Sequence, residues 1–168
     1  MDLVSLLQDD HDIIRKFIQE IESSDHLPVK ARIFAEMLNF VRAHFRAEET
    51  ALYAKSLRSA VFELNDLALD GFEEHHLLDD LIYRIKNVKI DDPLWLSRVK
   101  DYCQILDLHL VGEEADFFPE LKNFLSVTEL DRAAVVYLKA KKSELIIAEQ
   151  ELQQDFDFIS GTQINYEN

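Results

Sequence analysis

Apolar residues recur along the chain at alternating intervals of three and four positions, the spacing of one buried face of a helix in a bundle. In the first segment these positions are Val4, Leu7, Ile14, Ile18 and Ile21. Asp2 or Ser5 can cap the start of this helix. The stretch 22–26 breaks the pattern, so the first helix is predicted to end there.

Capping residues and prolines divide the rest of the chain into further helices. Pro28 suits the first turn of a helix, and Asp92 followed by Pro93 combines an N-cap with a first-turn proline. Ser126 and Glu129 form a capping box. Together with the apolar spacing, these signals predict helices over about 28–57, from between 59 and 66 to about 88, from 93 to a bend or end at Pro119, and over about 126–155.

The composition supports an all-α fold. The 168 residues include only 3 glycines and 3 prolines, which leaves few breaks for short strands, and this length suits one domain. We predict an up-down-up-down four-helix bundle over residues 1–125, an additional C-terminal helix over 126–157 and a frayed tail over 158–168. The apolar stripe of the fifth helix can pack against the bundle or against a second copy of the chain, which would give a homodimer.

The two halves of the predicted bundle repeat one another. The segment DHDIIRKFI around His11 matches EHHLLDDLI around His75 at an offset of 64. The segment HFRAEETALYA from His44 matches HLVGEEADFFP from His109 at an offset of 65. This repeat predicts a bundle with pseudo-twofold symmetry and equivalent sites facing its axis.

Polar residues interrupt the buried face at equivalent places in both halves. These residues are His11, His44, Glu48, His75, His109 and Glu113. A buried carboxylate without a partner is strongly unfavourable, and this face carries no lysine or arginine. A pair of divalent metal ions would supply the missing positive charge, because carboxylates can bridge two metals while neutral imidazoles complete the coordination.

The donor set narrows the choice of metal. One zinc ion does not need six ligands, and calcium or magnesium does not need imidazole. The mixed nitrogen and oxygen set suits iron first and manganese second. The alternative for any single histidine is a core residue hydrogen-bonded to a neighbour, but this does not account for six polar residues at one level of four helices.

Taken together, these motifs resemble the hemerythrin family, specifically the bacterial hemerythrin-like (HHE cation-binding) domains. The matching pieces are H in DDHDII, H-x3-E in HFRAE, H in EEHHLL, H-x3-E in HLVGE and the segment FFPEL, within residues 1–124. The resemblance implies a non-haem centre of two iron ions. In that centre Glu48 and Glu113 would bridge the metals, and the four histidines would be terminal ligands.

The chain departs from the oxygen-carrying hemerythrins at two points. Those proteins place two histidines one turn apart on the third helix, whereas Gly71 and Asp79 stand one turn from His75 here. Both bridging acids are glutamates in H-x3-E, rather than one H-x3-E and one H-x4-D. Reversible oxygen carriage is therefore not implied. His76 is the candidate extra ligand, although it lies about 100° from the buried face and a surface position is the alternative.

Gly71 occupies a position of the buried face that is Leu7 in the other half of the repeat. Two interpretations follow. The glycine either allows close packing of helices, or leaves space for an exogenous ligand or water on the metal.

The charge and the termini limit the partners. The net charge of −15 opposes binding to nucleic acid or to an anionic membrane. The single cysteine, Cys103, excludes an intrachain disulfide. The first twelve residues lack the basic segment and apolar run of a signal peptide, and no stretch has the roughly 18 apolar residues of a spanning helix. We therefore expect a cytoplasmic protein.

The predicted function is di-iron binding with small-ligand chemistry. The protein would sense, hold or detoxify a diatomic ligand such as oxygen or nitric oxide, or supply iron. One alternative is an enzyme that uses the same centre for peroxide or nitric oxide reduction or for iron–sulfur cluster repair. The other is an interaction module in which the metal is structural.

Overall fold

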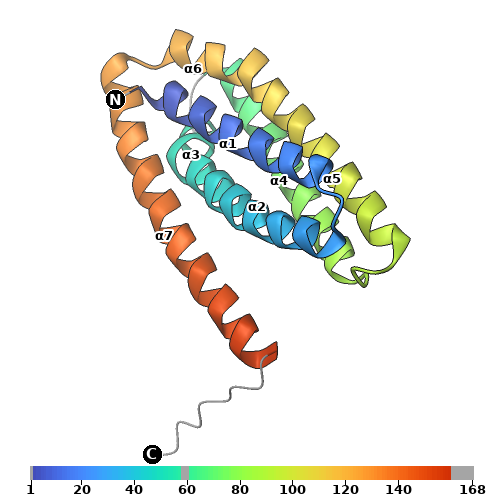
Figure 1. The fold of residues 1–168 in the computed structure, drawn as a ribbon. Coiled ribbons are helices and arrows are strands. Elements are labelled where there is room, and N and C mark those ends of the chain that lie inside the picture. Colours follow the sequence, from blue (N-terminus) through green and yellow to red (C-terminus); the bar gives the residue numbers. More distant parts are fainter. Residues whose placement is uncertain (1, 58–60, 160–168) are drawn as a thin grey trace, which may run out of the picture.

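Helices make up all the regular secondary structure in the part of the chain that the computed structural model describes, residues 2–57 and 61–159 (Figure 1). They are α1 (Leu3–Ser23), α2 (Leu27–Glu48), η1 (Glu49–Tyr53), α3 (Ala54–Ser56), α4 (Phe62–Lys86), α5 (Pro93–Gly112), η2 (Glu113–Phe117), α6 (Phe118–Phe124) and α7 (Val127–Ile159). The predicted all-α class is confirmed. Of the predicted tail, residues 160–168 lie outside the described residues.

Three predicted helix starts coincide with observed caps. The Asp2 side chain accepts a hydrogen bond from the backbone of Val4, and that of Asp92 accepts one from Leu94 at 2.9 Å. At the start of α7 the backbone N–H of Ser126 donates to the Glu129 carboxylate at 3.0 Å. These contacts satisfy backbone N–H groups that a helix leaves unpaired at its first turn.

Helix α1 packs on α2, and α4 packs on α5, so that each half of the repeat forms one helical pair. Their buried apolar residues form two separate clusters. One contains Leu7, Leu52 and Phe117, and the other contains Ile14 and Met37. His11 lies between Leu7 and Ile14 on α1, so a layer of polar side chains divides the core into two parts.

The second and fourth long helical segments each contain a π-helix. The backbone N–H of Ala54 donates to the carbonyl of Glu49, and that of Phe118 donates to the carbonyl of Glu113, five residues back. The sequence predicted that Pro119 either bends or ends this helix. The prediction of an end is wrong, because helical structure continues to Phe124. Pro119 stands in the first turn of α6, directly after the wide π turn, where a missing N–H is tolerated.

Helix α7 lies along α2 and η1 and also touches α1, on the side of the bundle away from α5 (Figure 1). Its side chains Leu130, Ala134 and Tyr137 are buried there. The fifth helix therefore covers the first helical pair, and within the described ranges 2–57 and 61–159 no helix covers the equivalent face of the second pair. No helix among the described residues is both long enough and apolar enough to cross a membrane.

Candidate metal centre

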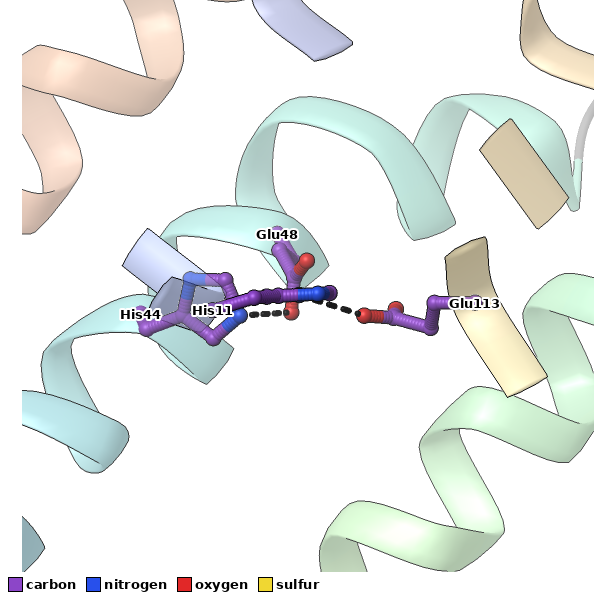
Figure 2. Close-up of side chains that lie close together, drawn as sticks. All are labelled: His11, His44, Glu48 and Glu113. Carbon is purple, nitrogen blue, oxygen red and sulfur yellow. Dashed lines mark ion pairs between the residues drawn. The ribbon is translucent and has the colours of Figure 1, made fainter. Parts of the chain in front are cut away.

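Six polar side chains from four helical segments meet inside the bundle, each at most 5% exposed. They form two groups in which one potential ligand atom per residue lies within 4.8 Å of the others. The groups are His11, His44, Glu48 and Glu113 (Figure 2), and Glu48, His75, His109 and Glu113. Both groups contain Glu48 and Glu113, so these two carboxylates lie between two histidine pairs.

Each shared carboxylate connects the two histidine pairs. Oε2 of Glu48 lies 3.4 Å from Nε2 of His44 and 3.7 Å from Nε2 of His75. Oε2 of Glu113 lies 3.2 Å from Nε2 of His11 and 3.7 Å from Nε2 of His109. Two of these contacts are the dashed lines in Figure 2. The arrangement has the pseudo-twofold symmetry that the repeat predicts.

A second ring of carboxylates faces the outer nitrogen of every histidine. The pairs are His11 Nδ1 with Glu114 at 2.8 Å, His44 Nδ1 with Asp10 at 3.4 Å, His75 Nδ1 with Glu49 at 3.0 Å, and His109 Nδ1 with Glu74 at 2.7 Å. A carboxylate only accepts hydrogen bonds, so Nδ1 carries the proton. The lone pair of each Nε2 then points into the centre, as in histidines that bind metals.

The inward-facing atoms lack the partners that buried polar atoms normally have. Among the described residues, no hydrogen bond reaches His11 Nε2, His44 Nε2, either oxygen of Glu48, or Oε2 of Glu113. Nε2 of His75 and Nε2 of His109 lie 3.2 Å apart, so both nitrogens also face the centre. Cations within the two groups would satisfy all of these atoms, so the residues present fit a two-metal centre.

Burial sets the protonation of the centre in the absence of a cation. It is the main cause that raises the pKa of Glu48 well above the ordinary value, and the negative charge of Glu113 adds to it. Burial also lowers the pKa of His44 to about 4 and lowers that of His75. Burial acts to lower the pKa of His109, but the carboxylates of Glu113 and Glu74 outweigh it and raise the pKa overall. A bound cation would replace the protons that this site otherwise needs.

Tyr53 belongs to the centre, and the apolar spacing did not indicate it. Its hydroxyl donates a hydrogen bond to Oε1 of Glu113. Tyr53 follows Glu48 by five residues, which in an α-helix would turn it about 140° away. The π-helix η1 restores it to the same face. Its repeat partner Phe118 has no hydroxyl and lies with its ring 5.2 Å from that of His11.

The space expected beside Gly71 is filled by Tyr53. A Cβ atom at Gly71 would lie 2.5 Å from the Tyr53 hydroxyl oxygen. The expectation of an empty position next to the metals is therefore wrong at this point, and Gly71 serves the close packing of the phenol. In the other half the equivalent positions hold Leu7 and Phe118, which share one hydrophobic cluster.

His76, the candidate extra ligand, is exposed and belongs to neither group. Its offset from the buried face of α4 turns the imidazole toward solvent. The structure thus gives no support to a seventh ligand from this helix position.

Helix α7 also reaches the centre, through residues that the sequence indicated only as a packing stripe. The Tyr137 hydroxyl lies 2.6 Å from His44 Nδ1 and donates to Asp10. The Lys141 ammonium lies 2.5 Å from the same Asp10 carboxylate. Burial raises the pKa of Asp10, but hydrogen bonds from His44, Lys141 and Tyr137 outweigh it and lower the pKa to about 2. The fifth helix therefore holds the carboxylate that orients His44.

Comparison with known proteins agrees with this geometry. The structure of an HHE cation binding domain-containing protein from Mycobacterium kansasii superposes with a TM-score of 0.78, covering 91% of this chain and 93% of that chain at 19% identity. A protein of Nostoc sp. named DNA nickase is 26% identical over 145 residues, which are 86% of this chain but 40% of that protein. A hemerythrin-like protein of Schizosaccharomyces pombe is 23% identical over 79% of this chain and 66% of its own length. The Hemerythrin HHE cation binding domain family matches residues 2–121, and the chain belongs to this family.

Proposed function

We propose that this protein holds two iron ions and uses them to bind or convert a small ligand such as oxygen or nitric oxide. One observation supports this most directly: two donor groups share both of their carboxylates. Shared carboxylates are the ligands that bring two cations close together, whereas a mononuclear site would leave half of these buried atoms unpaired.

In this proposal Glu48 and Glu113 bridge the metals, His11 and His44 complete one site, and His75 and His109 complete the other. A bound iron pair would supply electrons and would take up the small ligand. The protein supplies orientation and charge. Each outer carboxylate holds one Nδ1–H and so aims the opposite nitrogen inward.

Arginines hold two of the outer carboxylates in turn. Arg15 donates to Glu114 at 2.8 Å, and Arg46 donates to Glu49 at 2.6 Å. These ion pairs fix carboxylates that would otherwise rotate, and they restrain the imidazoles behind them. A third contact acts on a bridge itself, since the Tyr53 hydroxyl holds Oε1 of Glu113 and leaves Oε2 facing the centre.

One alternative is an enzyme that uses the same centre to reduce peroxide or nitric oxide or to repair iron–sulfur clusters. The other is an interaction module in which the metal only stabilises the fold. Turnover with an electron donor distinguishes the enzyme from a protein that binds its ligand stoichiometrically. The nickase activity named for the Nostoc protein is not part of this proposal for two reasons. The chain spans 40% of that protein, and its net charge of −15 opposes binding to a phosphodiester backbone. Manganese in place of iron, self-association and a cytoplasmic location stay predictions.

Protein purified without oxygen is expected to contain about two irons per chain, because two bridging carboxylates suit two ions. Elemental analysis, together with optical spectra before and after addition of oxygen or nitric oxide, measures both the count and the response. One tightly held zinc, with no affinity for a second ion, would contradict the dinuclear proposal. Iron spectra that change with neither ligand would be consistent with the metal centre but would contradict the small-ligand function.

Acid is expected to remove the metal and to destabilise the fold. The ligating imidazoles must stay neutral in the loaded protein, whereas the unfolded chain binds protons at its histidines near pH 6.5. The unfolded state thus holds more protons, so the free energy of unfolding falls as the pH drops below about 6.5. Burial lowers the pKa of His44 to about 4 in the folded protein, so this residue also makes the free energy of unfolding fall as the pH drops. Thermal unfolding of loaded and chelator-treated protein from pH 8 to 4.5 tests this; equal stability of both forms throughout would show that the centre is not coupled to folding.

A further inference from the structure

A cavity of about 110 Å³ leads from the surface between α4 and η2 to the candidate metal centre. Tyr53 and Glu113 line its inner end, and Gly71 and Gly112 line its sides. Its volume holds a few water molecules. Gly112 presents no side chain that would narrow the passage, whereas the position of a side chain at Gly71 is occupied by the Tyr53 ring.

The inner end of this cavity carries a buried carboxylate. Glu113 is 5% exposed, and no hydrogen bond from the described residues reaches its Oε2. The cavity therefore leads to one of the two carboxylates shared by both donor groups.

The outer rim of the cavity is acidic. Asp70, Glu74 and Asp116 line it, and all three are exposed on the surface. Within residues 2–57 and 61–159, no ion pair with a basic side chain is found for Asp70 or Asp116. The rim thus keeps its negative charge, which raises the local concentration of cations.

The repeat shows that these features belong to one half of the bundle only. The positions equivalent to Asp70, Gly112 and Asp116 are the apolar residues Leu6, Ala47 and Ala51. Ala47 is fully buried in the half that α7 covers. The position equivalent to Glu74 is Asp10, which α7 buries beneath Tyr137 and Lys141. The covered half is therefore apolar and closed where the other half is acidic and open.

We propose that this cavity is the uptake route by which a divalent cation reaches the metal centre, with Asp70 and Asp116 as the first carboxylates that the cation meets. The inference rests on the proposed metal centre and adds a site that is separate from its ligands. A hydrated cation is held at the rim by charge, passes the two glycines, and reaches the carboxylate of Glu113.

The test is the rate of Co²⁺ uptake by chelator-treated protein, followed by the visible absorption of bound cobalt, with helix content monitored by circular dichroism. The variant Asp70→Asn/Asp116→Asn removes the rim charge and keeps the side-chain shapes. We expect its uptake rate to fall about tenfold at low ionic strength and the difference to shrink in high salt, because salt screens the attraction. The final cobalt content is expected to equal that of the wild type.

Asp91→Asn/Asp101→Asn is the matched control, because it removes two exposed acids that do not line the cavity. It is expected to change the rate by less than about twofold. Equal rates in test and control variants would overturn the proposal. A lower final cobalt content in the test variant would also overturn it, since Asp70 and Asp116 would then act on the centre itself. A wild-type protein that binds no cobalt would instead contradict the metal centre.

Gly112 allows a second test, with one measurement on the loaded protein and one on the chelator-treated protein. A Cβ atom added there would meet no atom within 4 Å, so Gly112→Leu is expected to fold normally. It narrows the passage, and we expect slower loss of iron from the loaded protein to excess chelator. Gly112→Lys adds repulsion and should slow cobalt uptake more than Gly112→Leu does. Unchanged rates in both variants would rule out this route.

Discussion

Glu48→Ala and Glu113→Ala are each expected to reduce the iron content from about two ions per chain to one or none. Each carboxylate belongs to both donor groups and is at most 5% exposed, so no water shell replaces it readily. Its loss removes a ligand from two metals at once and half of the negative charge between them. Because changes outside the ligand sphere already lower metal affinity about 10–100-fold, loss of a bridge should exceed that range.

The fold of these variants is expected to survive without metal. Metal-free wild type buries two carboxyl groups side by side, and removal of Glu48 relieves the cost of burying that group and its repulsion with Glu113. Metal-free Glu48→Ala should therefore be at least as stable in urea as metal-free wild type. His11→Ala and His75→Ala serve as controls that each remove one terminal ligand and should lower iron content less. Full iron content and an unchanged spectrum in either glutamate variant would contradict the bridging role of that residue.

Gly71→Leu is expected to lower the free energy of unfolding by about 3 kcal/mol, at the upper end of overpacking costs. Even a Cβ at this position would lie 2.5 Å from the buried Tyr53 hydroxyl, and leucine adds three more carbons. The gain in helix propensity over glycine, about 1 kcal/mol, does not offset this clash. Displacement of the phenol also breaks its hydrogen bond to Glu113.

Addition of Tyr53→Phe to Gly71→Leu is expected to recover part of that stability, because the hydroxyl is removed while the ring carbons Cζ and Cε2, 2.6 and 2.9 Å from the added Cβ, still have to shift. The double variant recreates in the second half the pair that the first half already contains, Leu7 and Phe118. Urea unfolding of wild type, both single variants and the double variant measures the coupling between the two positions. A stable Gly71→Leu protein would show that Tyr53 does not need the glycine. Recovery of no stability at all in the double variant would show that the ring carbons of residue 53 carry the whole clash and that the hydroxyl contributes nothing to it.

The sequence predicted those parts of the centre that follow α-helical spacing. The six inward-facing residues follow α-helical spacing. The repeat also indicated them, because three occur in one half and three at equivalent positions in the other. Asp10 and Glu74 also left a signal, because each repeat has an acid immediately before its histidine. The sequence did not show which histidine each acid contacts, because Asp10 contacts His44 and Glu74 contacts His109 on a different helix.

The remaining residues could not be predicted from periodicity. Tyr53 reaches Glu113 only because η1 adds a residue to its helical turn, and no apolar interval marks a π-helix. Tyr137 and Lys141 follow Asp10 by more than 120 residues, and their contacts depend on the direction in which α7 leaves the bundle. The same tyrosine fills the space that was expected beside Gly71. The unpredicted π-helix therefore explains both the missed Tyr53 contact and the missing space.

The side chains that converge on the centre lie between His11 and Glu113, almost two thirds of the chain apart. A filled centre would therefore act as a cross-link that closes a loop of about 100 residues, and a link of that span removes about 4.7 kcal/mol of chain entropy from the unfolded state in the usual loop-closure treatment. With Cys103 as its single cysteine, the chain can form no intrachain disulfide of its own. Unlike a disulfide, a metal cross-link can be made or undone in a reducing environment, so the supply of the ion would set how long the bundle stays closed.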